Sequence, residues 1–524
     1  FDFLGLKTLS IIKKAVDTIA ITQGVELDPL KFPLDDADTF AMLAKGDNAA
    51  VFQLESAGMQ DLCRQMRVKN FDEAAAIIAL FRPGPMENIP RYLACQKGEE
   101  ELDYMHPLLE PVVKDTYGVM IYQEQVMQAA QVLAGYSLGG ADLLRRAMGK
   151  KIKEEMDAQR ELFMTGANDN HNIAEEKASE IFDQIAAFAG YGFNKAHTYA
   201  YAYVAYQTAY LKAHYPVEFM AATMTYDMGT TDKLAFFRQQ LNLMGIPLLL
   251  PDINKSEVEF AVQKDEDETP AIRYALAALK GVGGAAMASL VDERRAKGLY
   301  KDLFDIAQRC DSKVLNKRQM ESLAAAGAFD LMNPNRNEVM SAIETILRYA
   351  SMLTAEKESG QHSLFGGSGE AELPKPPLPN LPPFDPLEKL EKEFKAVGFY
   401  LSAHPLDSME AQLEKLKVTF FADVQRQLRV SPSSRIKMAG IVTKKQEKVS
   451  AKGNRFAFVQ ISDSTGVYEA TVFSDVLAAS RDILTTGSTV MAQMDVQVQG
   501  EDDIKFLAQH FEPLEKAVDF ATET

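Results

Sequence analysis

The segment that most constrains how this chain can fold is residues 188–216, FAGYGFNKAHTYAYAYVAYQTAYLKAHYP. Its tyrosines recur at helical spacing until Pro216 stops the pattern, which predicts a helix preceded by a glycine-rich turn. The turn delivers Lys195 and His197 to the helix N-terminus, a combination of charge, hydrogen-bond donors and backbone amides suited to holding an anion. The alternative is a capped amphipathic helix with a tyrosine stripe in the core, which we favour for the tyrosines alone.

A second cationic segment, ADLLRRAMGKKIKEEMDAQRELF at residues 141–163, predicts one long helix with an apolar stripe. Arg146, Lys150 and Lys153 fall on another face at similar spacing, and Arg145 and Lys151 stand beside them. Five cations within nine residues exceed what a solvated face needs, so we favour anion binding. Gly149 costs roughly 1 kcal/mol relative to alanine inside a helix, which indicates a close backbone approach or a kink.

The length and composition of the chain narrow the classes of protein to which it can belong. At 524 residues it is too long for one core, so we expect several domains. No apolar run approaches a transmembrane span and no signal peptide precedes the first domain, and three distant cysteines fit neither a disulfide framework nor a zinc site. These features predict a reducing, cytoplasmic location without a membrane. A net charge of −18 argues against a chain coated in nucleic acid but allows local basic grooves.

Motifs near the N-terminus each leave two interpretations. Asp2 lies at the end of an apolar, strand-like segment, either beside a cation or as the N-cap of a helix predicted from residue 7 to 20. Asp36 and Asp38 precede an apolar-periodic helix, and capping explains them better than metal binding. Arg82 stands before a rigid Pro-Gly-Pro turn, which is either a structural corner or a phosphate contact.

The composition changes near residue 260, where we place a domain boundary. Residues 277–287 predict a helix, a Gly-Val-Gly hairpin and a second helix. Gly281 and Gly283 allow a close backbone approach to a phosphate, and Lys280 adds charge, as in units that bind nucleic acid without reading bases. The alternative is a plain helix connector. A second helical pair over 314–329 would complete a tandem.

A linker rich in Gly, Ser and Pro follows at residues 359–386. It contains the peptide Gln361-His362-Ser363-Leu364-Phe365. Two large apolar residues in an exposed segment indicate that a partner covers them.

From residue 436 to 514, short alternating strands with a glycine-rich bend predict a small Greek-key barrel of the oligonucleotide-binding type. Lys444 and Arg455 belong to a cluster of cations at its first hairpin, with Phe456 and Phe458 alongside. Cations beside aromatic rings are typical of single-strand binding. The alternative, which we weigh equally, is that the aromatics are core and the lysines protect an edge.

Taken together, four segments resemble the bacterial replicative DNA polymerase III alpha subunits of the family C polymerases. These are FDFLGL at 1–6, FRPGP at 81–85, residues 141–151, and YGFNKAHTYAYA with YQTAYLKAHYP between 191 and 216. The resemblance implies a multi-domain, mainly α fold with a small C-terminal Greek-key β-barrel. The implied order is the end of the palm (1–10), fingers (11–260), a tandem helix-hairpin-helix region (261–358), a clamp-binding peptide with Pro-rich linker and helical connector (359–424), an OB-fold domain (425–515) and a tail (516–524).

The resemblance also implies roles for individual residues. Asp2 matches a palm carboxylate that helps to hold two Mg²⁺ ions. The residues matching positions that grip the triphosphate of the incoming nucleotide are Arg145, Arg146, Lys195 and His197. Gly281 and Gly283 match a hairpin that holds the duplex backbone. Gln361, Leu364 and Phe365 match an internal clamp-binding peptide.

The implied function is template-directed nucleotidyl transfer by a DNA-directed DNA polymerase. The implied partners are primer-template DNA, dNTPs, the beta sliding clamp, a clamp-loader-linked subunit and a proofreading exonuclease. The chain starts at Phe1 without methionine, and the paired palm aspartates of the family are not in it, so we expect a fragment that does not polymerise DNA by itself. The competing interpretations are a non-catalytic DNA-binding or scaffold protein of repair or recombination, and an interaction protein whose basic patches are only solvated.

Overall fold

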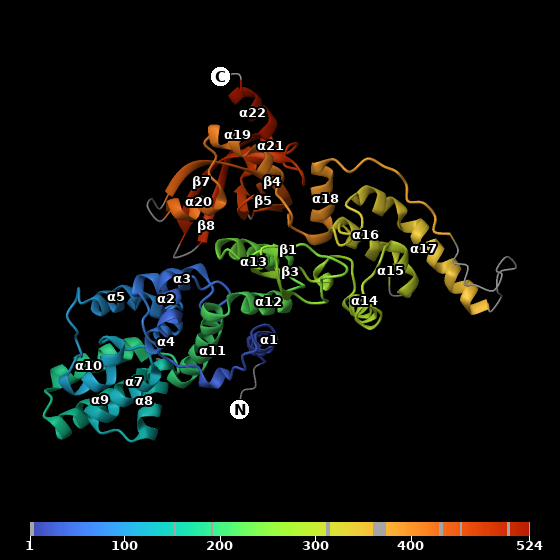
Figure 1. Ribbon diagram of the computed structural model, residues 1–524. Helices are drawn as coiled ribbons and strands as arrows, with labels where there is room; N and C mark the ends of the chain where they lie inside the picture. The colour runs from blue at the N-terminus through green and yellow to red at the C-terminus, as the bar shows by residue number, and fades with distance from the viewer. Residues whose placement is uncertain are drawn as a thin grey trace. The chain divides into compact units, whose positions relative to one another are not determined.

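A computed structural model describes residues 5–150, 153–189, 192–310, 315–359, 374–428, 433–450, 453–499 and 503–522 (Figure 1). The chain divides into two compact units, Phe1–Phe219 and Met220–Thr524. Helix α12 (Pro216–Tyr226) crosses the boundary between them. Some of the predicted site residues lie outside the described residues. These are Asp2, Lys151 and the peptide from Gln361 to Phe365, which includes Leu364.

The first unit is helical. Its helices are α1 (Lys7–Gln23), α2 (Ala37–Lys45), α3 (Ala57–Met66), α4 (Phe71–Leu80), α5 (Ile89–Lys97), α6 (Glu110–Val113), α7 (Gln123–Ala134), α8 (Leu138–Lys150), α9 (Lys153–His171), α10 (Glu175–Ala189) and α11 (Lys195–His214). The predicted helix after residue 7 is confirmed as α1. The capping interpretation of Asp36 is confirmed, because its carboxylate accepts the Thr39 N–H at 2.8 Å at the start of α2.

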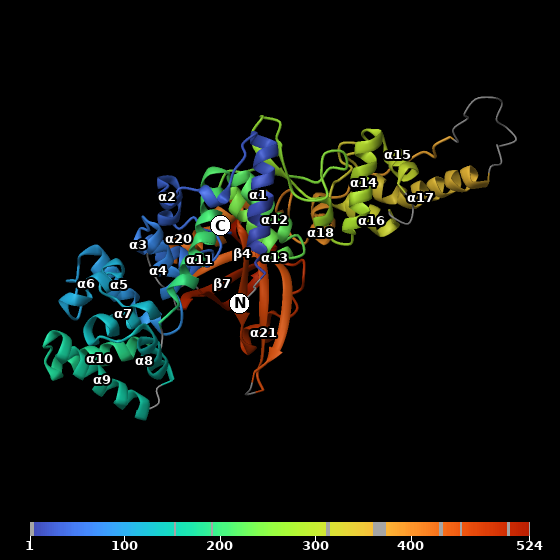
Figure 2. The same ribbon diagram turned by 90° about the horizontal axis from the view of Figure 1, so that it is seen from below.

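Helices α7 to α10 share one core, and Figures 1 and 2 both show them gathered together. Leu144 of α8, Phe163 of α9 and Phe182 of α10 are fully buried in it. Of the expected helix over 141–163, the structure describes the parts within α8, to Lys150, and α9, from Lys153. Residues 151 and 152 between them lie outside the described residues, so the expectation of one continuous helix stays a prediction.

Helix α11 confirms the predicted tyrosine helix, and its tyrosines are structural. Tyr206 is buried against Phe40 and Phe71, and its hydroxyl bonds the backbone before α2. The Tyr199 hydroxyl donates to Asp72 at 2.7 Å. The stripe therefore joins α11 to α2 and α4, as we favoured from the sequence.

The second unit combines helices with two sheets. Its helices are α13 (Thr231–Leu243), α14 (Gly284–Lys297), α15 (Leu303–Arg309), α16 (Lys317–Ala325), α17 (Arg336–Ser359), α18 (Pro386–Val397), α19 (Glu410–Lys415), α20 (Phe421–Leu428), α21 (Ser474–Ser480) and α22 (Leu514–Thr522). Strands β1 (Leu248–Leu249), β2 (Ala261–Lys264) and β3 (Pro270–Arg273) form a small sheet in the order β1-β3-β2. Within the described ranges, no helix is long and apolar enough to span a membrane.

In the hairpin region, the segment before Gly281 differs from the predicted helix. A 3₁₀ turn at Leu276–Ala278 stands where we expected a helix, and α14 begins directly after Gly283. The backbone N–H groups of Leu276 and Ala277 donate to the carbonyls of Glu257 and Val258, so they are not available to a helix. The expected helical pair over 314–329 is also wrong: in the described part of that range the structure has α16, which packs on α17.

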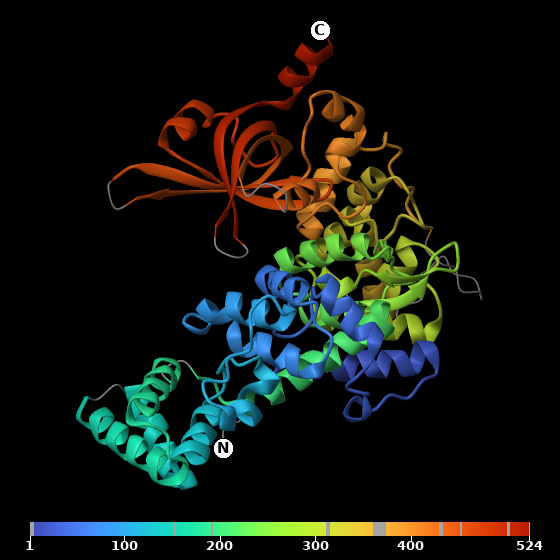
Figure 3. The same ribbon diagram turned by 90° about the vertical axis from the view of Figure 1, so that its left-hand side faces the viewer.

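A closed barrel forms the C-terminal part of the second unit, and Figure 3 shows it in orange and red. Its strands are β4 (Ser433–Val449), β5 (Arg455–Asp463), β6 (Gly466–Val472), β7 (Thr489–Gln499) and β8 (Asp503–Pro513), in the order β4-β5-β6-β8-β7. Only the β6–β8 pair is parallel among these described ladders. This closed five-stranded arrangement confirms the Greek-key barrel and the mainly α multi-domain fold class.

The two faces of β5 decide between the interpretations of its aromatics. Ala457, Val459 and Ile461 point into the barrel and are fully buried. Phe456 and Phe458 alternate with them, so they lie on the outer face, where both are half-buried. The Lys448 ammonium lies 4.9 Å from the centre of the Phe458 ring. The interpretation of these aromatics as core is therefore wrong, and they share a face with the lysines.

Candidate nucleotide-binding site

A short pairing between distant segments builds the candidate site in the first unit. Phe193, just before α11, bridges to Tyr122, just before α7. The Gln123 N–H donates to the Phe193 carbonyl at 2.8 Å, and the Phe193 N–H donates to the Ile121 carbonyl at 3.1 Å. The N-termini of α7 and α11 are therefore held side by side. We call residues 121–124 the α7 entry segment.

Glu124 in this segment occupies the N-terminus of α11. Its carboxylate accepts the Lys195 backbone N–H at 2.8 Å and the Asn194 side-chain amide at 3.1 Å. Asn194 in turn caps the helix by accepting the His197 N–H at 2.7 Å. We expected these amides to face an anion, and the structure shows that the amides of Lys195 and His197 have protein partners. An anion here would be held by side chains, because the Glu124 carboxylate repels it from the helix end.

Asp142 pairs with both arginines of α8, and Arg145 also contacts the α7 entry segment. Arg145 donates to Asp142 from Nε at 3.1 Å and Nη2 at 2.8 Å, and from Nη1 to the Gln123 side-chain oxygen at 3.4 Å. Arg146 pairs with the other oxygen of Asp142 at 2.8 Å and is 61% exposed. The hydrogen bond from Arg145 lowers the pKa of the Asp142 carboxyl, which keeps it charged. Arg145 is thus held in one orientation, and Arg146 faces solvent.

Aromatic rings set the positions of the cations on α11. The Lys195 ammonium lies 5.4 Å from the Tyr122 ring centre and 5.3 Å from that of Tyr199. The His197 ring lies 4.3 Å from Tyr201 and meets Phe193 edge-on at 5.4 Å. These contacts place both side chains around the α7 entry segment.

Arg82 joins the same group from the Pro-Gly-Pro turn. Its guanidinium carbon lies 3.9 Å above the Phe193 ring, and its Nε donates to the Ala79 carbonyl at 3.0 Å. Burial lowers the pKa of Arg82. The position beside Phe193 places Arg82 near His197, so the turn that reads as a corner in the sequence also brings a cation toward the site.

The structure therefore brings together the four cations that the sequence predicted for a triphosphate: Arg145, Arg146, Lys195 and His197 lie on elements that meet at residues 121–124. Their role in holding a triphosphate stays a prediction. Sequence reasoning missed Gln123 and Glu124. The available signal was a pair of polar residues opening a helix, which is too common to single them out.

Metal binding has no support among the described residues. No group of three or more His, Cys, Asp or Glu side chains that could hold an ion occurs in the part of the chain that the structure describes. Asp2, the predicted metal ligand, lies outside that part. The described residues therefore do not fit a metal centre.

The predicted DNA-binding residues belong to the second unit. Gly281 has φ +82, and a Cβ there would lie 3.1 Å from Nε of Arg318, so the hairpin is closely packed. Lys280, next to Gly281, and Lys444 of β4 line one cavity. Arg455, at the start of β5, and Gly283, before α14, are not among the residues that line it. Their contact with DNA stays a prediction.

These features define a multi-domain, mainly helical protein in which a cation-bearing helical unit precedes a hairpin region and a closed barrel. The family described as the bacterial DNA polymerase III alpha subunit finger domain matches residues 8–171, and the helix-hairpin-helix motif family matches residues 245–339. Similar proteins include the DNA polymerase III subunits alpha of three bacteria. That of Caulobacter vibrioides (strain NA1000 / CB15N) is 44% identical over 519 residues, covering 99% of this chain and 44% of the relative.

The subunits of two further bacteria match the chain to a similar extent. The subunit of Neisseria meningitidis serogroup B (strain ATCC BAA-335 / MC58) is 41% identical over 520 residues, with 99% of this chain and 44% of the relative covered. The subunit of Rickettsia bellii (strain RML369-C) is 40% identical over 539 residues, with 99% and 45% covered. The chain belongs to the bacterial DNA polymerase III alpha subunit family. It spans less than half the length of these relatives.

Proposed function

We propose that this chain supplies the fingers of a replicative DNA-directed DNA polymerase and grips the triphosphate of an incoming dNTP. The observation that carries the proposal is the meeting of α8 and α11 cations at the α7 entry segment. Arg145 is held by Asp142 and Gln123, so little side-chain entropy is lost when it binds a phosphate. Membership of the family supports the same activity.

The chemistry of the proposed reaction assigns each cation a task. Nucleotidyl transfer builds charge on the phosphate oxygens in the transition state, and guanidinium groups stabilise it by bidentate hydrogen bonds. Arg145 and Lys195 would align the triphosphate for in-line attack. Arg146 would exchange its ion pair with Asp142 for a phosphate contact. Base choice would come from pairing with the template.

The rest of the proposed machinery rests on the family resemblance. Two Mg²⁺ ions would be held by Asp2 with further carboxylates of the polymerase, and we propose that this chain alone does not extend a primer. The described residues offer no metal site, so we assign no step to the ions. The domain limits given above stay predictions, and the free cysteines support a cytoplasmic location.

The remaining partners are proposals of the same kind. Gly281 and Gly283 would hold the duplex backbone, while Lys444 and Arg455 would contact single-stranded template. Gln361, Leu364 and Phe365 would dock on the beta sliding clamp. A clamp-loader-linked subunit and a proofreading exonuclease would join through other parts of the polymerase.

Direct binding of a fluorescent dATP to the 524-residue chain, measured by anisotropy, tests the proposal. Each charge-assisted contact is worth about 1.5–3 kcal/mol, so Arg145→Ala and Lys195→Ala should each weaken binding about 10-fold or more. Lys177→Ala removes an exposed cation of α10 that pairs with Glu180, and it should leave affinity unchanged.

Equal nucleotide affinity in all of these variants would contradict the proposed triphosphate site. A chain that binds DNA with a steep salt dependence but ignores nucleotides would instead support a non-catalytic DNA-binding protein. Extension of a labelled primer by the chain alone would overturn the proposed need for further carboxylates.

A further inference from the structure

A cavity of about 470 Å³ lies within the second unit, between α13 and the barrel. Its walls come from α13, the residue before the Gly281 hairpin, the end of α18 and strands β4 to β6. The volume falls in the range of roughly 300–1,000 Å³ that small-molecule sites occupy. We call it the α13–barrel pocket.

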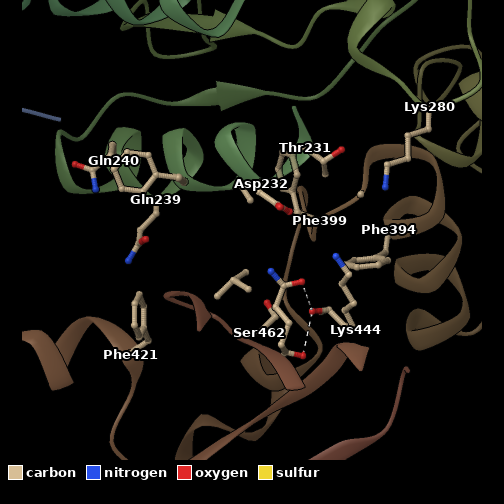
Figure 4. Close-up of a pocket in the computed structure, with 16 residues that line it drawn as sticks. Thr231, Asp232, Gln239, Gln240, Lys280, Phe394, Phe399, Phe421, Lys444 and Ser462 are labelled. Atoms are coloured by element: carbon tan, nitrogen blue, oxygen red, sulfur yellow. Dashed lines mark hydrogen bonds between the residues drawn. The ribbon is translucent and has the colours of Figure 1, made fainter. Parts of the chain in front are cut away.

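The walls of this pocket are in direct contact with each other. A Cβ added at Gly466 of β6 would lie 2.7 Å from the Phe421 ring and 3.0 Å from Nε2 of Gln239 on α13. The glycine is therefore needed for α13 to pack on the barrel. The same contact places Gln239 and Phe421 on opposite walls, and Figure 4 shows Gln239 pointing toward Phe421.

Lys280 is fixed to the rim of the pocket by its backbone. Its N–H donates to the Ala396 carbonyl at 2.7 Å at the end of α18, and its carbonyl accepts from the Ser322 hydroxyl. A Cβ at Gly398 would overlap the Lys280 ammonium. Gly398 thus leaves the space through which the lysine side chain enters the pocket.

The lining offers three kinds of contact. Figure 4 shows Lys280 and Lys444 on the same side of the pocket, where Phe394 also lies. Both lysines are exposed, and neither forms an ion pair with another described residue. Phe394 and Phe421 present half-buried rings, and Gln239 and other side-chain amides present donors and acceptors.

An unpaired nucleotide matches these three contacts together. Its base stacks on an aromatic ring and bonds to amides, and its phosphate pairs with ammonium groups. Asp232 also lines the pocket, and its carboxylate repels a phosphate but can accept a hydrogen bond from an N–H group of a base, such as the N3–H of thymine. We therefore place the phosphate on the lysine side. A base that is still paired and stacked in a duplex cannot enter.

We propose that the α13–barrel pocket binds one unpaired nucleotide of single-stranded DNA, with its phosphate held between Lys280 and Lys444. The proposal takes the class of ligand from the proposed role in DNA synthesis, but it concerns a site in the other unit and needs no dNTP. It also predicts that the hairpin and the barrel grip one strand at one point. The loss of either lysine then has the same effect on the salt dependence.

The first test is the binding of the full chain to labelled oligothymidylate across a salt series. Each phosphate contact on a single strand contributes about −0.7 to the slope of log K against log salt. Because the two lysines share one phosphate, Lys280→Ala and Lys444→Ala should each make the slope less negative, by up to about 0.7. Lys516→Ala, at an exposed position of α22, is the matched control and should leave the slope unchanged. Slopes equal to that of the control would overturn the proposal.

The second test asks whether a base enters the pocket. Ala235→Phe fills the pocket from α13 and keeps both lysines, whereas Leu243→Phe adds the same ring at an exposed position of α13 that does not line it. Stacking is worth about 1–3 kcal/mol per base, so Ala235→Phe should weaken oligothymidylate binding about 5-fold or more and leave binding of an abasic oligomer unchanged.

Equal affinity of the wild-type chain for oligothymidylate and the abasic oligomer would overturn the base-binding part. An equal loss for both oligomers in Ala235→Phe would overturn it as well. Retained dATP binding in these variants shows that the first unit is intact. Loss of dATP binding in Arg145→Ala with normal oligothymidylate binding would separate the two proposals, because each residue acts in a different unit.

Discussion

At the scale of single residues, the buried cation Lys212 shows how the first unit holds a loop through backbone carbonyls. Its side chain is only 5% exposed, and its ammonium donates to the carbonyls of Asp47 and Ala49 at 2.7 Å each. Burial lowers the pKa of Lys212 to about 8. The loop before α3 is therefore anchored to α11 by one charge that is costly to bury.

This burial makes stability depend on pH. In the unfolded chain lysine has a pKa of about 10.4, so between about pH 8 and pH 10.4 the unfolded state binds more protons. The stability of the wild type should therefore rise with pH across that window, by up to about 3 kcal/mol relative to Lys212→Met. Thermal unfolding of both proteins at pH 8 and pH 10 measures the difference. A gap that stays constant with pH would contradict the lowered pKa.

At the scale of elements, the residues of β5 alternate between the barrel core and its outer face. Those in the core are expected to contribute to stability, and those on the outer face to DNA binding. Phe458 lies on the outer face under Lys448, and Val459 is fully buried in the barrel. Phe458→Ala should weaken oligothymidylate binding about 5-fold or more, because about 1–3 kcal/mol of stacking is lost per base, with little change in unfolding.

Val459→Ala is the matched comparison on the neighbouring residue. It should cost about 2 kcal/mol of stability through the cavity it leaves, and it should leave binding at low temperature near the wild-type value. Unfolding curves and anisotropy titrations on the same samples measure both. If Phe458→Ala were the more destabilising change, the outward position of its ring would be wrong.

The elements also show what the sequence could predict. The helices and the barrel follow from local period, and Asp36 follows from its place before a helix. The α7 entry segment could not be predicted, because Glu124 meets Lys195 across 71 residues and neither residue marks the other in the sequence. The 3₁₀ turn at Leu276–Ala278 was not predicted for the same reason. Its backbone N–H groups donate to the carbonyls of Glu257 and Val258, which lie about 20 residues earlier in the chain. The periodicity of apolar residues predicts helices and strands, whereas contacts between segments far apart in the sequence determine where the sites form.

At the scale of the whole molecule, the division into two units implies that damage to one is felt mainly there. Arg336, which is 4% exposed, joins α17 to α18 by pairing with the fully buried Glu393 at 3.2 Å and with Asp330 at 2.8 Å. Glu393 also accepts the N–H groups of Leu401 and Ser402, at 3.2 and 2.7 Å, so it fixes the chain that leads from α18 toward the barrel.

Arg336→Met should therefore destabilise the second unit selectively. It leaves the Glu393 charge buried without its cation, a change that typically costs about 3–5 kcal/mol. Calorimetry should show the transition of the second unit moving to lower temperature, while dATP binding by the first unit persists at the temperature where oligothymidylate binding is lost. Arg435→Met, which breaks an ion pair with Asp495 from a 67% exposed arginine, is the surface control and should cost about 1 kcal/mol at most. If Arg336→Met abolished both binding activities at one temperature, the two units would unfold as one.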